Sequence, residues 1–363
     1  MSQIVFAHLY NDRSGSPRIL ASVIESLRSE REAILYVGSA GSGVLDDTGV
    51  SLSKYFYART ASKLINAGMF FLSQLHLFFC LLLDRRIKPT ATIYVNTVLP
   101  FGAALYGFLT GRAVIYHLHE VSISPKILMR FLVFIARRTA IKFVYVSRFH
   151  LEALSICPDK SVLLPNAVDV QLYEHSLKEN VVAKRHVFKI LMLASLKDYK
   201  GVPEFIRLAK RLEHFPEVEM ELVANAPESE IREYFAGMSF PANLRVFPST
   251  AQPWTHYSKA DLLMNMSRVD KWVETFGMTI VEAMCFGVPC IAPPIGGPRE
   301  IVRDGVDGYL IDSRNEDDVY AAVERLIFDK DLLKRMKTAA KKRSEDYFPE
   351  RFQSRVKELL EQK

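Results

Sequence analysis

Two glutamates eight positions apart are the side chains best placed to act on a bound substrate. Glu274 precedes an aromatic-glycine step and Glu282 lies in the apolar run behind it, in ETFGMTIVEAMCFGVPC. The pattern predicts a loop at 275–277 and a helix over 278–286 that ends at Gly287. The first turn of such a helix exposes unpaired backbone N–H groups at the positive end of its dipole, which suits phosphate or sugar oxygens. Glu282 would lie about one turn inside the helix, within reach of the hydroxyls of a group bound there.

The elements that must position these glutamates alternate between strand and helix. The first half predicts strands at 4–8, 33–37, 92–96, 114–118 and 143–146, and the second half at 186–194, 219–224, 244–247, 262–265 and 290–292. Such alternation predicts two doubly wound parallel sheets. The polar, aperiodic stretch 166–185 suits a linker between them, and 363 residues suffice for two domains of ordinary size.

The glutamates belong to a longer ordered pattern. Residues 274–310 read E-x7-E with FG at its third and fourth positions, then EAM-x2-G-x-P and GG-x2-E-x-V. This run resembles the retaining glycosyltransferases of family 4. The resemblance implies the GT-B fold, with two Rossmann-like domains facing across a cleft. It further implies an acceptor-binding domain at 1–170, a nucleotide-sugar-binding domain at 171–343, and a helix at 344–363 that crosses back to the first domain.

The resemblance also implies roles for individual residues. It places Glu274 beside the donor sugar and Glu282 on the ribose of the nucleotide. The backbone that meets the diphosphate and the sugar is that of Phe276, Gly277, Met278 and Thr279.

Three further positions match the family less completely. Lys200, in LASLKDYKG, matches a lysine that binds the diphosphate, but Ser195 stands where an arginine is expected. Lys197 is the nearest substitute, and Arg268 and Lys271 are others. His119 resembles a histidine that contacts the donor sugar. Alternation along a strand points His117 to the same face, so the choice between the two stays open. Gly15 represents a glycine-rich loop near the phosphates.

These residues predict transfer of a sugar from a nucleotide-diphosphate sugar to a glycan or lipid-linked acceptor, in assembly of a bacterial surface polysaccharide or lipopolysaccharide. Glu274 would orient the sugar, and the acceptor would attack from the face that the phosphate leaves. We expect no metal and no cofactor besides the donor. Two alternatives remain: a nucleotide-sugar epimerase or phosphorylase with the same build, and a non-catalytic partner subunit, which Ser195 would favour.

Composition and charge suggest where the protein works. The four cysteines, Cys80, Cys157, Cys285 and Cys290, have neither zinc-site nor disulfide spacing, and the first residues already form a strand in place of an export signal, so we expect the cytoplasm. Residues 1–170 hold 18 Lys and Arg against 11 Asp and Glu, whereas the remainder holds 29 against 30.

A basic stripe of Lys126, Arg130 and Arg137 on a predicted helix could bind the anionic inner face of the plasma membrane, or be a solvated edge. No nucleic-acid partner is expected.

The segment 64–83 has the length of a membrane span. Its polar residues Asn66, Ser73 and Gln74 share one helical face, and a strand follows within ten residues. We therefore expect a helix buried on both sides within an α/β layer.

Overall fold

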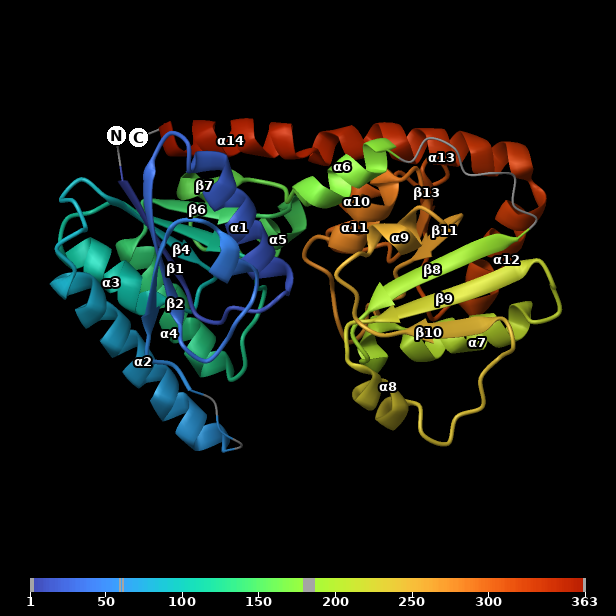
Figure 1. Cartoon of the computed structure of the whole chain (residues 1–363), viewed down its shortest axis with the longest axis horizontal. Coiled ribbons are helices and arrows are strands. Elements are labelled where there is room, and N and C mark those ends of the chain that lie inside the picture. Colours follow the sequence, from blue (N-terminus) through green and yellow to red (C-terminus); the bar gives the residue numbers. More distant parts are fainter. Residues whose placement is uncertain (1–2, 59, 61, 179–186, 362–363) are drawn as a thin grey trace. The chain divides into compact units, whose positions relative to one another are not determined.

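The computed structural model describes residues 3–58, 60, 62–178 and 187–361 (Figure 1). The described chain divides into two compact units. Val168–Pro349 forms the second, and the residues before it together with those from Glu350 onward form the first. The last helix, α14 (Pro349–Glu361), therefore belongs almost wholly to the first unit. Of the expected linker 166–185 and strand 186–194, residues 179–186 lie outside the described residues.

The first unit is built on a parallel sheet of seven strands in the order β3-β2-β1-β4-β5-β6-β7. The strands are β1 (Gln3–His8), β2 (Glu32–Gly38), β3 (Ser51–Tyr55), β4 (Thr92–Asn96), β5 (Val114–Leu118), β6 (Lys142–Tyr145) and β7 (Ser161–Leu163). The order reverses at β1, which lies between β2 and β4. In such sheets the strand carboxyl ends at the reversal form the usual ligand site.

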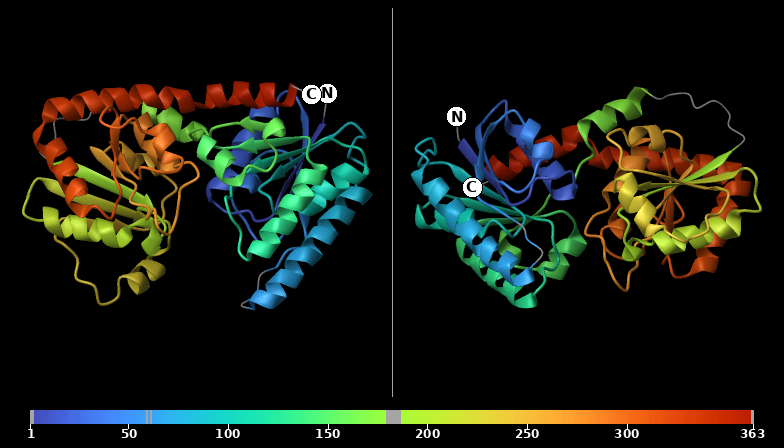
Figure 2. Two further views of the ribbon diagram at one scale, coloured as in Figure 1. Left: turned by 180° about the vertical axis from the view of Figure 1, so that it is seen from behind. Right: turned by 60° about the horizontal axis from the view of Figure 1, so that its bottom comes forward.

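Helices cover this sheet. They are α1 (Gly15–Leu27), α2 (Lys63–Leu83), α3 (Phe101–Leu109), α4 (Lys126–Thr139) and α5 (Arg148–Leu154). Helices α2, α3 and α4 lie side by side, and their inner residues share one apolar core with the strands (Figures 1 and 2). From α14, the backbone carbonyl of Leu359 accepts a hydrogen bond from Lys142 Nζ at 2.8 Å, and Lys357 pairs with Glu30.

The expectation that α2 is buried on both sides is wrong. Only 28% of Ile65–Leu83 is buried. Ser73 and Gln74 are fully buried, whereas Leu72 and Leu75 are each about half exposed. Ser73 and Gln74 thus face inward, where Gly102 N donates to Gln74 Oε1 at 3.2 Å. The outer face is formed mainly by apolar residues, and the inner face adds Leu77 and Leu81 to the core.

The second unit has a parallel sheet of six strands in the order β10-β9-β8-β11-β12-β13. These are β8 (Phe188–Ala194), β9 (Val218–Ala224), β10 (Leu244–Phe247), β11 (Leu262–Met264), β12 (Cys290–Ala292) and β13 (Gly308–Leu310). Its helices are α6 (Val170–Lys178), α7 (Val202–Leu212), α8 (Glu228–Tyr234), α9 (Trp254–Tyr257), α10 (Met278–Cys285), α11 (Pro298–Ile301), α12 (Glu316–Phe328) and α13 (Lys330–Ser344). The order reverses between β8 and β11, and the loops after these two strands carry the candidate site.

Candidate active site

The second unit brings Lys200 and Glu274 into direct contact. Lys200 Nζ lies 2.5 Å from Glu274 Oε1, and Ser267 Oγ donates to the same oxygen at 3.0 Å. Both charged side chains are about one-fifth exposed, so solvent and a ligand can reach them. Lys200 follows β8 and Glu274 follows β11, which are neighbours in the sheet. Two groups 74 positions apart in the chain therefore meet because the carboxyl ends of parallel strands share one edge.

The start of α10 lies immediately after Glu274. Gly277 is the residue before the helix, and its φ of 118° belongs to a region that other residues rarely adopt. A Cβ on Gly297 would lie 2.3 Å from the backbone of Phe276, so the Gly-Gly turn can pack against the loop only without a side chain. Gly297 N donates to Glu274 O at 2.9 Å. These contacts fix the loop at 274–277, which leads from Glu274 to the first turn of α10.

Glu282 is inside α10 and only 5% exposed. Its Oε2 accepts a hydrogen bond from Tyr257 OH at 2.7 Å. Phe276 is also buried, with its ring edge-on to Tyr347 at 5.8 Å between centroids. Met278 and Thr279 are partly exposed at the first turn. Of the residues expected to bind the donor, Glu282 and Phe276 are therefore buried, whereas Met278 and Thr279 at the first turn of α10 are partly exposed.

In the first unit, His119 lies just beyond β5 and its Nε2 is 2.9 Å from Asn96 Oδ1. Asn96 is fully buried at the end of β4. Its Nδ2 also donates to Ser16 O at 3.1 Å and lies 3.0 Å from His8 Nδ1. Asn96 therefore links His119 to the first turn of α1, where Gly15 lies with open space around it. The sequence predictions did not include Asn96, although it ends a predicted strand.

His117 and His119 have their rings 4.4 Å apart, but their surroundings differ. His117 is fully buried, and its Nδ1 contacts Tyr94 OH at 2.9 Å. His119 is only partly buried at the strand end. Of the two, His119 is the one that a ligand can reach.

We call His8, His117, His119 and His150 the histidine cluster. Burial lowers the pKa of each of them, to about 4 for His8 and about 3 for His117. Burial also raises the pKa of Glu120 to about 7. The cluster is therefore neutral at physiological pH and acts through hydrogen bonds, not through positive charge.

A strained backbone marks the same strand ends. Thr97 follows Asn96 and has a φ of 71°, which is costly for a β-branched residue. Thr97 N donates to His117 O at 2.8 Å, which helps to hold this conformation. Residues kept in such conformations cluster at functional sites.

Residues 176–343, nearly the whole second unit, match the family "Glycosyl transferases group 1". The similarity to this family lies in the second unit. A D-inositol 3-phosphate glycosyltransferase of Geodermatophilus obscurus is 32% identical to the chain over 106 residues, which are 29% of this chain and 23% of that relative. The chain thus spans under a quarter of that curated relative.

Solved structures extend the similarity to the whole fold. Anabaena Alr3699/HepE in complex with UDP and glucose aligns over 100% of both chains with a TM-score of 0.79 at 20% identity. WaaG, a glycosyltransferase involved in lipopolysaccharide biosynthesis, aligns over 97% of this chain and 99% of its own with a TM-score of 0.71 at 13% identity. The predicted GT-B fold of two Rossmann-like parallel-sheet domains is confirmed.

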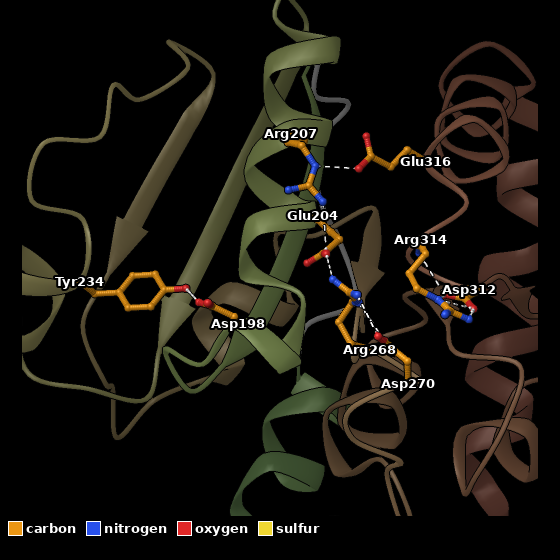
Figure 3. Close-up of polar contacts among 9 residues, drawn as sticks. All are labelled: Asp198, Glu204, Arg207, Tyr234, Arg268, Asp270, Asp312, Arg314 and Glu316. Atoms are coloured by element: carbon orange, nitrogen blue, oxygen red, sulfur yellow. Dashed lines mark hydrogen bonds and ion pairs between the residues drawn. The ribbon is translucent and has the colours of Figure 1, made fainter.

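Arg268 has a structural role in the second unit, so it does not replace the arginine expected at Ser195. Figure 3 shows its guanidinium between Glu204, at 2.8 Å, and Asp270, at 3.0 Å. Glu204 is 3% exposed and also pairs with Arg207 at 3.2 Å. Arg268 N donates to Tyr199 O at 2.8 Å. The Arg268 contacts thus fasten the loop that carries Glu274 to the segment that carries Lys200.

Of the other substitutes considered, Lys197 and Lys271 are both exposed near these loops. Trp272 is a neighbour that the sequence predictions missed. Its ring lies 4.9 Å from Lys200 Nζ and 5.4 Å from the ring of Tyr199. The indole therefore holds the lysine ammonium beside Glu274 through a cation–π contact.

The described residues contain no group of three or more His, Cys, Asp or Glu side chains arranged to hold a metal ion. The sequence contains an Asp-x-Asp triplet at 329–331, and its first residue has a structural role. Asp329 caps α13, where its side chain accepts from Leu332 N at 2.8 Å.

Proposed function

We propose that this protein is a retaining glycosyltransferase that moves a sugar from a nucleotide-diphosphate sugar to a glycan or lipid-linked acceptor. The observation that carries the proposal is the contact of Lys200 with Glu274 beside the start of α10. A cation, a carboxylate and the N–H groups of a helix start then come from neighbouring residues of one loop region. Those are the groups that a diphosphate and an attached sugar require.

Each group has a distinct task in this proposal. Lys200 and the N–H groups at Gly277, Met278 and Thr279 stabilise the charge that develops on the leaving phosphate. Glu274 accepts hydrogen bonds from the sugar hydroxyls. Glu282, with Tyr257 on one of its oxygens, binds the ribose.

The bond between the sugar carbon and the phosphate oxygen breaks as the acceptor oxygen attacks from the same face. The acceptor proton passes to the leaving phosphate, so no metal and no enzyme nucleophile are required. His119 and Gly15 in the first unit are the proposed contacts of that unit with the donor, and Lys197 is a further phosphate contact.

Two structural neighbours support a proposal for the donor and the setting. Because the Anabaena structure contains UDP and glucose, UDP-glucose is the first donor to test. Because WaaG acts in lipopolysaccharide biosynthesis, we propose a role in assembly of a bacterial surface glycan. The enzyme would work in the cytoplasm at the inner face of the plasma membrane. There Lys126, Arg130 and Arg137 of α4 would contact anionic lipid, each contributing about 1 kcal/mol.

Variants of the central pair test the proposal. Glu274→Ala and Lys200→Ala should each lower kcat for sugar transfer by about 100-fold or more, since each removes a group that acts on the reacting diphosphate sugar. Glu230→Ala, on the exposed surface of α8, is the matched control and should keep wild-type kcat.

The assay is release of UDP from UDP-glucose, with and without a glycan acceptor. Wild-type rates in both variants would refute the assigned roles. Epimerisation of the donor without any acceptor would favour the epimerase alternative. If no nucleotide sugar in a panel raises the melting temperature of the protein, the non-catalytic subunit is favoured.

A further inference from the structure

Helix α2 buries two polar residues and exposes a row of apolar ones. Ser73 and Gln74 face the interior and are fully buried, and Ser73 Oγ donates to Phe70 O at 2.7 Å. Leu72, Leu75 and Phe79 follow one another at helical spacing and are 51%, 54% and 47% exposed. An ordinary surface helix has the opposite arrangement.

The exposed face of α2 continues onto α4. Phe71 of α2 lies 5.7 Å from Phe131 of α4 between ring centroids, and both rings are partly exposed. Farther along α4, Ile127 and Phe134 are also exposed. We call the exposed apolar residues of these two helices, which lie side by side in Figures 1 and 2, the outer apolar surface. Continuous apolar surfaces of this kind mark sites of contact with a partner or a membrane.

The charges around this surface identify the partner. Neither α2 nor α4 contains an aspartate or a glutamate. Lys126, Arg130 and Arg138 are exposed on α4, and the Arg138 guanidinium lies 5.3 Å from the ring centroid of Phe134. Apolar side chains bordered by cations suit the boundary between anionic headgroups and acyl chains. A symmetric contact with a second copy would instead bring these cations together.

We propose that α2 and α4 seat the protein on an anionic bilayer, with α2 in the plane of the interface and its outer residues inserted among the acyl chains. This extends the peripheral location proposed above, in which basic residues alone make the contact. Helix α2 would lie on the membrane and not cross it. Leu77 and Leu81 on its inner face are fully buried in the core of the first unit, and a spanning helix would have to withdraw them.

The test uses a double variant, Leu75→Glu with Phe79→Glu, and Leu177→Glu on α6 as the matched control. Leu177 is also half exposed but lies in the second unit. Binding is measured by sedimentation with vesicles of equal parts phosphatidylglycerol and phosphatidylethanolamine, at low and high salt. We expect wild type and control to bind and to retain part of their binding at high salt. The double variant should lose at least about tenfold in partitioning, because two large apolar groups can no longer enter the bilayer.

Three results would overturn the proposal. Equal binding of the double variant and wild type, abolished by salt, would leave only the electrostatic contact. Lipid-free dimerisation that the double variant abolishes would make the surface an interface between copies. Resistance of wild type to alkaline carbonate extraction would show that α2 spans the bilayer. The rise in melting temperature with UDP-glucose is measured for wild type and for the double variant. An equal rise shows that the double variant is folded and binds the donor, whereas no rise in either protein counts against the transferase assignment and not against the membrane contact.

Discussion

Removal of Arg268 tests whether its ion pairs hold the candidate site together. Arg268 is 24% exposed and bonds to Glu204, whose side chain is 3% exposed. Glu204 Oε2 has no hydrogen-bond partner among the described residues, so the carboxylate depends on its cations. In Arg268→Met, Glu204 would keep only Arg207, at 3.2 Å and with a side chain that is 49% exposed.

The expected cost follows from this geometry. Removing one partner of a buried ion pair costs about 3–5 kcal/mol, because the other charge stays buried. Arg207 offsets part of that cost, so we expect a loss of about 2–3 kcal/mol in the free energy of unfolding of the second unit. For a unit of this size, that loss lowers the melting temperature by about 4–12 °C.

Urea denaturation of three variants measures this effect. Arg268→Met should show the full loss. Arg314→Ala, which removes an exposed ion pair with Asp312, should change stability by less than about 0.5 kcal/mol. Arg268→Met combined with Glu204→Leu should recover most of the loss, because no buried charge remains. A double variant less stable than Arg268→Met, or a single variant as stable as wild type, would refute the reasoning.

Two other predictions concern the site and its pH response. Trp272→Leu should raise the KM for the donor about fivefold through loss of the cation–π contact with Lys200, whereas Trp272→Phe should stay near wild type; equal KM values would contradict this role. The free energy of unfolding should fall as the pH falls from about 6.5 toward about 4, by at most about 1.4 kcal/mol per pH unit for each residue of the histidine cluster, because the unfolded chain binds protons that the folded cluster does not. The raised pKa of Glu120 has the opposite sign, since the folded state keeps a proton up to about pH 7 and gains stability as the pH falls. Glu120→Gln should therefore steepen the decline in thermal melts between pH 7 and pH 5, and a shallower decline would show that the assignment is wrong.

The sequence predicted the inner strands well and missed three of the four edge strands, β3, β7 and β13. Strands β4, β5 and β12 have the bounds expected, since each is a short, mostly apolar run bounded by turn residues, and the edge strand β10 also has the bounds expected although it contains Arg245. Strand β3 was missed because SLSKY is half exposed and reads like a loop, and β7 and β13 have only three residues each. A strand can be predicted from the sequence when both of its faces are buried, because its residues must then be apolar.

The predictions for α2 and for the site failed for other reasons. The length of α2 was evident, but a helix apolar on nearly all sides does not reveal which face is exposed. The helix was expected to be buried on both sides, whereas packing against Gly102 places Gln74 inside and leaves the opposite face exposed. The Lys200–Glu274 contact required the resemblance, because spacing along the chain gives no distance between loops of different strands. Asn96 had a usable signal, since it ends a strand adjacent to that of His119.

The position of α14 has a consequence for how the chain folds during synthesis. The second unit is one continuous segment, Val168–Pro349, whereas the first is completed by residues from Glu350 onward. Phe352, Val356 and Leu359 of α14 are buried. On the ribosome, the first unit emerges early but lacks the helix that covers part of its core, so the second unit can finish folding before it. Until α14 arrives, the nascent first unit leaves apolar surface open to chaperones.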